Sequence, residues 1–415
     1  MKWRDVLMAE KLFKRGTFTF IGSLMEGKEL VTTQQMGKSD WKKTRLNVGT
    51  KNDNNLQFLS VEYIHSDKFK TTKLFGADGE SFDVNWEDTM KPEVLVKVPE
   101  YNRIVVDLET DFEKKKEYTK LIFKKYNHEI KEEKTEDDIE KIKEYDKQIK
   151  ELATNRIEFI HIKDVIKFLE KSIPLIKDKK VKVLGDVKSN YYNGKNILQY
   201  IPNRIELVEN STENQLKVYL DMFYEKDSID DDKKEKKITI MGYVGERVKK
   251  QDKLYPLITT IDYSKIDEEN EQHKMLLEFM RNIFKITDKK QVHKIGLELN
   301  IINGAEIVEF DESCLTPDQK MGIALGLNTI DDFKPKGNTY GSRIQELRVC
   351  RPDLKNYPNG SIEVFPVRDL ADYLVADDSD KTEDEVKQNK DEKEEEKKED
   401  SSSTTEDLMK ELFGK

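Results

Sequence analysis

The clearest alternation of apolar and polar residues in the chain runs through Val181–Leu207. Within it, Val183 and Val187 alternate with charged residues, which is the period of a strand with one buried face and one solvent-facing face. Asn193-Gly194 follows, and both residues tolerate the positive φ of a two-residue turn. The segment therefore predicts a β-hairpin whose return strand starts near Ile197.

Short apolar runs separated by Gly, Asn, Asp and Lys occur along most of the chain. Many short strands at such spacing predict a sandwich or a small barrel. The expected strands are Thr17–Ile21, Leu46–Val48, Leu56–Ile64, Thr71–Phe75, Ser81–Trp86, Val94–Val98, Arg103–Leu108, Arg156–Ile162, Leu216–Tyr224, Ile238–Val244, Leu254–Tyr263, Ile295–Ile302 and Ala305–Phe310, the last two flanking an Asn303-Gly304 turn.

Other segments have the three-to-four-residue period of helices. Residues 111–152 predict a protruding helical hairpin whose second helix is capped by Thr135 and whose narrow apolar stripe packs on itself or on a partner helix. Asp164 is expected to cap a short helix, and His273–Ile286 predicts another. Strand, helix and Asn-Gly hairpin recur in this order, which suggests a duplicated or tandem domain.

Chain length and charge distribution refine this prediction of the fold. The 415 residues exceed what one hydrophobic core organises, so two domains are expected. Of the net charge of −10, the segment Asp377–Lys415 carries −8, from sixteen acidic and eight basic residues, which leaves −2 for the first 376 residues. Residues 1–50 hold ten basic and five acidic side chains, a local +5. Local patches rather than the net charge therefore decide whether phosphates bind.

The sequence shows no sign of export. No apolar run approaches the roughly 20 residues that cross a bilayer, and the N-terminus lacks the apolar core of a signal peptide. We therefore expect a cytoplasmic protein. Cys314 and Cys350 are the only cysteines, which excludes a disulfide framework or a four-cysteine zinc site, and both are expected to be buried.

The acidic tail, residues 376–415, has the composition of a disordered segment with a different tip. Ser403 and Glu406 form a capping-box pattern ahead of four apolar residues on one side of a short helix. The tip is a candidate partner-binding segment, or else a chance apolar end on a solubilising tail. Its apolar residues are Leu408, Met409, Leu412 and Phe413.

Catalytic motifs are few. Asp107 and Glu109 end an expected strand in the Asp-x-Glu pattern of two-metal exonucleases, or they cap the helix that follows. The five histidines are scattered singly, and neither a phosphate-cradling loop nor a serine elbow is present. We therefore expect a binding protein and not an enzyme, with no catalytic residue, metal or cofactor.

Aromatic and basic residues interleave at several places, a combination suited to the bases and phosphates of a single strand. Phe18, Phe58 and Phe82 are expected to fill cores instead. The candidate nucleic-acid-binding residues are Trp41, Lys42, Lys43, Arg45, Lys68, Lys70, Lys73, Tyr191, Tyr192, Lys195, Tyr200, Arg204, Tyr243, Arg247, Lys249, Lys250, Tyr340 and Arg343.

The segments DVIKFLEKSI, VKVLGDVKSNYYNGKNILQYIPNRIEL and LKVYLDMFYEKD through KKITIMGYVGERV, with the acidic tail, resemble OB-fold single-stranded DNA-binding proteins of large phages infecting Gram-positive bacteria. The resemblance implies sequence-independent coating of single strands during DNA replication or recombination in the host cytoplasm, with the tail recruiting replication or recombination proteins. The tail departs from the family's pattern because Gly414 and Lys415 follow Phe413.

We therefore expect a mainly β fold with inserted helices (α+β), built from two OB-like small barrels in tandem. The first would span residues 1–210 and the second residues 211–375, followed by the tail. Two alternatives remain open. One is a scaffold or virion protein that binds partners through the helical hairpin and the tail; the other is a metal-dependent exonuclease.

Overall fold

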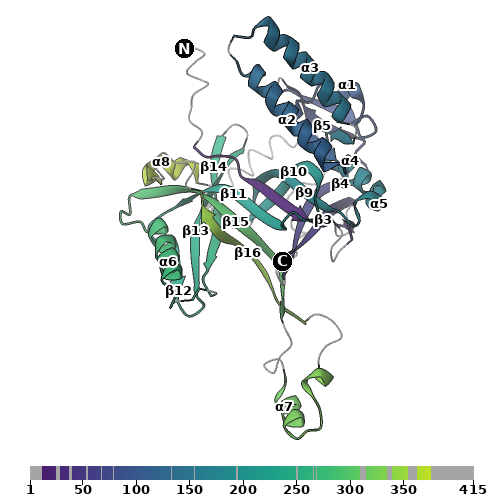
Figure 1. Cartoon of the computed structure of the whole chain (residues 1–415). Helices are drawn as coiled ribbons and strands as arrows, with labels where there is room; N and C mark the ends of the chain where they lie inside the picture. The colour runs from purple at the N-terminus through teal and green to yellow at the C-terminus, as the bar shows by residue number, and fades with distance from the viewer. Residues whose placement is uncertain are drawn as a thin grey trace, which may run out of the picture.

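The computed structural model is mainly β-structure with inserted helices, as the sequence predicts (Figure 1). Among the described residues, no helix is long and apolar enough to cross a membrane. The structure describes residues 12–24, 29–36, 40–52, 55–66, 68–77, 79–131, 133–153, 155–192, 195–248, 251–264, 266–267, 269–308, 315–333, 339–353 and 362–374.

The elements are β1 (Thr17–Gly22), β2 (Val31–Gln35), β3 (Trp41–Asn52), β4 (Asn55–Ser66), β5 (Thr71–Phe75), β6 (Ser81–Asn85), α1 (Pro92–Leu95), η1 (Glu100–Asn102), β7 (Ile104–Asp107), α2 (Phe112–Glu129), α3 (Glu136–Leu152), β8 (Arg156–Phe159), α4 (Ile162–Lys171), α5 (Ile173–Ile176), β9 (Lys180–Tyr192), β10 (Lys195–Val208), β11 (Gln215–Tyr224), β12 (Ile229–Asp232), β13 (Lys237–Val248), β14 (Gln251–Asp262), α6 (Glu271–Phe284), β15 (Gln291–Val308), α7 (Pro317–Ala324), η3 (Ile330–Phe333), β16 (Thr339–Pro352), β17 (Glu363–Pro366), α8 (Val367–Leu370) and η6 (Ala371–Tyr373).

Five strands of the second half close into a barrel. β11 pairs with β13, β13 with β14, β14 with β16, β16 with β15, and β15 again with β11. All these ladders are antiparallel except that between β14 and β16, which is parallel. α6 connects β14 to β15 and buries Leu277, Met280 and Phe284. Its amphipathic face therefore covers the barrel core, while its other face meets solvent.

The strands of the first half follow the same order. β1 pairs with β9 and β9 with β10, and β3 pairs with β4 in a long hairpin. An isolated bridge between Ser23 and Gly49, with two backbone hydrogen bonds of 3.0 Å, joins β3 to the end of β1. α4 lies ahead of β9 as α6 lies ahead of β15, and it buries Val165, Ile166 and Leu169. Beyond β10, the sheet continues through β7 and β8.

The two halves share one sheet. β1 pairs with β9 on one side and β11 on the other, so that Phe18 lies opposite both Gly185 and Val218. β4 of the first half also pairs with β15 of the second. One cluster of buried side chains accordingly runs through both halves. The predicted boundary at residue 210 falls between β10 and β11, and the division into two domains stays a prediction.

The helical hairpin predicted over residues 111–152 is confirmed. α2 and α3 pack against each other and project from the sheet (Figure 1). The Asp111 side chain accepts the backbone N–H groups that start α2, and Thr135 and Asp138 form a capping box at the start of α3. Lys131 and His128 also donate to Asp138, and together these bonds hold the pKa of its carboxyl well below its ordinary value.

The predicted turn at Asn303-Gly304 is wrong. β15 continues through these residues, where Gly304 lies opposite Ile344 of β16 and Gln57 of β4. Hydrogen-bonded neighbours on both sides hold the backbone extended, which overrides the local preference for a turn. Ile229–Asp232, although mostly acidic, forms β12 against β13.

Two further predictions are wrong near α1 and α4. Val94–Val98 is not a strand, because α1 begins at Pro92, whose fixed φ suits a first helical position. Asp164 lies inside α4, and the cap is His161, whose Nδ1 accepts a 3.1 Å hydrogen bond from the backbone N–H of Lys163. A histidine ring at this position supplies the acceptor that the sequence pattern assigns to a carboxylate.

The predicted core residues have mixed outcomes. Phe18 is fully buried, as expected, and Phe82 packs partly buried in a small cluster with α1. The side chain of Phe58 lies outside the described residues, as does Cys314. Cys350 is exposed on β16 and not buried as predicted.

Candidate nucleic-acid interface

The β9–β10 and β13–β14 hairpins meet at the junction of the two halves. The backbone N–H of Ser189 donates to the Glu246 carboxylate, and the rings of Tyr191 and Tyr255 lie 6.0 Å apart. Burial raises the pKa of Glu246 above its ordinary value, although the Ser189 N–H opposes this shift. The contact places two aromatic rings from different halves side by side, between the two hollows described next.

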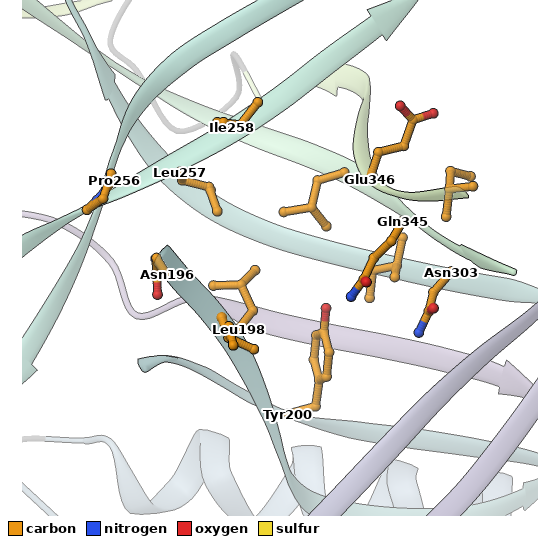
Figure 2. Close-up of a pocket in the computed structure, with 13 residues that line it drawn as sticks. Asn196, Leu198, Tyr200, Pro256, Leu257, Ile258, Asn303, Gln345 and Glu346 are labelled. Atoms are coloured by element: carbon orange, nitrogen blue, oxygen red, sulfur yellow. The ribbon is translucent and has the colours of Figure 1, made fainter. Parts of the chain in front are cut away.

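An apolar groove of about 440 Å³, here called the junction groove, lies on one side of this contact (Figure 2). It forms where β14 and β16 diverge, since these strands pair only at Thr260 and Arg348 among the described residues. Ile197 of β10 and Ile258 of β14 are 57% and 60% exposed. The lining residues are Asn196, Ile197, Leu198, Tyr200, Pro256, Leu257, Ile258, Ile301, Ile302, Asn303, Gln345, Glu346 and Leu347.

Amides provide most of the polar groups of the junction groove. Figure 2 shows Asn196 on the β10 side, and Asn303 and Gln345 across from it. The Oδ1 atom of Asn196 is buried, and no described residue donates a hydrogen bond to it. Burial raises the pKa of Tyr200, so its hydroxyl keeps its proton. An apolar slot bordered by amide donors and acceptors suits flat heterocyclic rings with polar edges.

Glu346 supplies the only carboxylate among the described residues that line the junction groove. Lys237 and Arg348 both form ion pairs with it. Burial opposes ionisation of Glu346, but these two cations outweigh it and keep its pKa below the ordinary value. The carboxylate is therefore neutralised at the groove edge and repels an anionic ligand less than a free one would.

A polar hollow of about 430 Å³, here called the cationic cleft, lies on the other side of the hairpin contact. Three cations line it: Arg15, Lys188 and Arg247. Arg15 pairs with Asp186 at 2.9 Å and Arg247 with Asp252 at 3.4 Å, whereas Lys188 forms no ion pair within 4 Å among the described residues. The Glu246 carboxylate also lines the cleft and attracts Lys188 and Arg15, so all three cations are partly compensated, Lys188 without a direct ion pair.

Phe13 lies at the base of the cationic cleft. A Cβ placed on Gly245 would come within 2.2 Å of the Phe13 ring, so the ring lies directly on the β13 backbone. Phe13 packs there with Phe223 and Leu254. The close approach requires glycine, and it fixes the segment that carries Arg15 against the second half.

The cations and rings of the β9–β10 hairpin do not share one face. Register and alternation place Tyr191 and Tyr200 on the face that looks toward the second half, with Lys188 on the opposite face. Tyr200 packs edge-on against Phe18, with ring centroids 5.4 Å apart. A bulge between Pro202 and Arg204 shifts the alternation, and Arg204 then pairs with Glu206.

The predicted cations of the first half lie outside the junction. Lys43 and Arg45 of β3 both pair with Glu62 of β4, which keeps the pKa of that carboxyl low despite its burial. Trp41 contacts the ring of Phe69. Of the remainder, Lys42 lies on β3, Lys68 pairs with Asp40, and Lys70 and Lys73 are exposed at and within β5.

The predicted residues of the second half are only partly placed. Tyr243 packs partly buried in the cluster of Phe13, and Arg247 lines the cationic cleft. The residues 249 and 250 and the tail tip lie outside the described part of the chain, as do the side chains of Tyr192, Lys195, Tyr340 and Arg343. The sequence pattern did not single out Tyr255, Ile258, Asn303 or Gln345 for this site, and it indicated Arg15 only through the basic N-terminal segment.

Asp107 and Glu109 have structural partners. Glu109 Oε1 accepts the backbone N–H groups of Thr110 and Asp111, and Glu109 Oε2 accepts from Lys114 and Asn155. The Asp111 N–H first, and then Lys114, lower the pKa of Glu109 to about 2. The cap of α2 is Asp111, so the prediction that Asp107 and Glu109 cap this helix is wrong, and Glu109 instead holds the loop that leads to it. Among the described residues, no group of three or more His, Cys, Asp or Glu could hold a metal ion.

No protein-family model matches the sequence, and no curated protein matches it significantly. Among solved structures, the chain is similar to a mutant of the single-stranded DNA-binding protein from Thermus aquaticus, with a TM-score of 0.28 and 8% identity over 83% of this chain and 97% of that one. A TM-score of this size does not identify a shared fold, so the architecture stands on the strand pairing alone.

Proposed function

We propose that the chain binds single-stranded DNA without sequence preference, in DNA replication or recombination. The observation that carries this proposal is the five-stranded ring of β11, β13, β14, β16 and β15. In chain order, α6 lies between its third strand, β14, and its fourth strand, β15. Five-stranded Greek-key barrels of the OB type bind oligonucleotides. The matching strand order in the first half supports a second OB-like barrel, and the boundary between the two lies near residue 210.

The junction is the proposed contact surface. Bases would lie against Leu198 and Leu257, which line the junction groove, and would stack near Tyr191. The phosphates would follow Lys188 and the other two cations of the cationic cleft. Stacking and phosphate contacts are indifferent to base identity, which accounts for binding without sequence preference.

A titration of fluorescein-labelled oligo-dT, followed by anisotropy at low and then high salt, tests the proposal. We expect binding at micromolar protein or below in low salt. Gln345→Glu places a charge in the junction groove, and we expect it to weaken binding at least about tenfold, since one stacked base contributes roughly 1 to 3 kcal/mol. Leu276→Asp on α6, where the side chain is 54% exposed, is the matched control. Absence of binding in low salt by the unmodified protein would overturn the proposal.

A second candidate function is a protein scaffold, as the sequence also allows. α2 presents exposed apolar side chains, including Phe123 at 65% and Ile130 at 58%, which no other described element covers. In the proposed function, the acidic tail recruits replication or recombination proteins to the DNA-bound chain, whereas a scaffold would bind its partners through the hairpin and the tail. A pull-down that recovers partners from a chain without DNA affinity would favour the scaffold function alone.

A further inference from the structure

α2 exposes an apolar stripe on the side away from α3. Ile122, Phe123, Tyr126 and Ile130 lie within one third of the helix circumference, at spacings of one, three and four residues. They are 40%, 65%, 55% and 58% exposed, whereas Leu121 on the opposite side is buried. A surface helix normally buries one apolar face, and α2 has a second apolar face that nothing in the described chain covers.

Lysines border this stripe on one side. Lys116, Lys120 and Lys124 follow one another along α2 and line a shallow hollow of about 570 Å³, which Asp111, Glu113 and Glu117 also line toward the start of the helix. Lys116 pairs with Glu113, but Lys120 and Lys124 form no ion pair within 4 Å among the described residues. Over Phe112–Glu129, six lysines against three glutamates give α2 a charge of +3. The apolar stripe with its cationic border therefore fits an amphipathic segment of negative charge.

The C-terminal tip of the chain has this chemistry. Leu408, Met409 and Leu412 repeat the one-and-three-residue spacing of Ile122, Phe123 and Tyr126, so two helices with these residues could lie side by side. Residues 377–400, directly ahead of the tip, hold thirteen acidic and six basic side chains, a net −7. Charge and apolar spacing are both complementary to α2.

The tether between the described chain and the tip is long, with a reach of at most roughly 110 Å when fully extended. Leu374 is the last described residue and pairs with Leu254. The 33 residues from 375 to 407 separate it from Leu408. A flexible chain of this length has a root-mean-square span of roughly 30 Å, and its acidic charge extends it further. Tethering also raises the local concentration of the tip to the millimolar range, so a weak contact suffices.

We propose that residues 403–413 dock on the α2 stripe of the same chain, with the acidic residues ahead of them beside Lys120 and Lys124. A second chain fits less well, because two α2 helices would bring their lysines together. A partner protein that takes the tip would have to compete with this contact. The α2 stripe thus holds the tail tip while no partner is bound. This inference is independent of DNA binding.

Photo-cross-linking in the full-length chain tests the docking. Benzoylphenylalanine replaces Phe413, and after irradiation the cross-linked peptides are identified by mass spectrometry. We expect cross-links to residues 119–130 of α2, reduced at least about fivefold by Phe123→Glu with Tyr126→Glu, and also reduced by Lys120→Glu with Lys124→Glu. Leu276→Glu, at the exposed Leu276 of α6, is the control and should leave the yield unchanged.

Three outcomes would overturn the proposal. Cross-links only to strands of the two barrels would place the tip elsewhere, and so would the absence of any cross-link. A mixture of isotope-labelled and unlabelled protein distinguishes contacts within one chain from contacts between chains, and purely intermolecular products would assign the stripe to a second copy. DNA binding is measured separately on the same samples, so failure of one proposal is distinguishable from failure of the other.

Discussion

Removing the three cations of the cationic cleft should reduce the salt dependence of single-stranded DNA binding. Each phosphate neutralised on a single strand contributes about 0.7 to the slope of log K against log salt concentration. Lys188 has no ion pair within 4 Å among the described residues and should contribute most, whereas Arg15 and Arg247 already contact Asp186 and Asp252. The combined change to glutamine should therefore lower the slope by about 0.7 to about 2.1.

Oligo-dT anisotropy titrations between 50 and 200 mM salt measure this slope. Over that fourfold range, the unmodified chain should lose about 3-fold to about 20-fold more affinity than the triple variant. The control combines Lys91→Gln, Lys289→Gln and Arg368→Gln, which remove exposed cations that also contact carboxylates but lie outside the cleft. Equal slopes for the two triple variants would refute the assignment of phosphates to the cationic cleft.

Three further predictions concern stability. Burial lowers the pKa of His161 from 6.5 to about 4. Between these pH values the unfolded chain binds more protons than the folded chain, so the free energy of unfolding falls by up to about 3 kcal/mol as the pH drops. His161→Asn should remove this loss, as measured by urea unfolding at pH 4 and pH 7. Glu109→Gln should cost about 2 kcal/mol near pH 7 by the same assay, and much less near pH 2. Gly185→Ala should lower stability by about 3 kcal/mol because its Cβ would lie 2.0 Å from the carbonyl oxygen of Ile201, whereas Gly296→Ala, with nothing closer than 3.4 Å, should be tolerated in thermal unfolding.

Local patterns predicted most elements because they depend on neighbouring residues. The alternating valines give β9, and the capping residues Thr135 and Asp138 start α3 as predicted. The face of the sheet on which each side chain of β10 lies could not be predicted in this way. Pro202 has no N–H to donate to the ladder, and the bulge beside it moves every later side chain to the other face. A single irregular residue therefore separates Tyr200 from Arg204.

The candidate site depends on contacts between distant segments, which no local pattern contains. Leu198 and Leu257 have the pattern of ordinary strand residues, and only the packing of β10 against β14 shows that they line one groove. Conversely, Lys43 and Arg45 form a basic pattern in sequence, but the register of β3 and β4 brings Glu62 between them. Burial and pairing of charges depend on the tertiary structure. The composition alone therefore overestimates the number of cations that are free to bind phosphates.

The sharing of β1 between the two halves has a consequence for binding. Because β1 is hydrogen-bonded to β9 and to β11, the hairpins that form the junction are anchored to one continuous sheet. Phe13 on Gly245 and Ser189 on Glu246 add two fixed contacts between the halves at that point. Two separately tethered barrels would lose orientational freedom relative to each other when a ligand binds between them. Two halves anchored in this way have already lost that freedom during folding. The junction groove and the cationic cleft thus form a preorganised surface, and their affinity should depend on the groove side chains more than on the ordering of one half against the other.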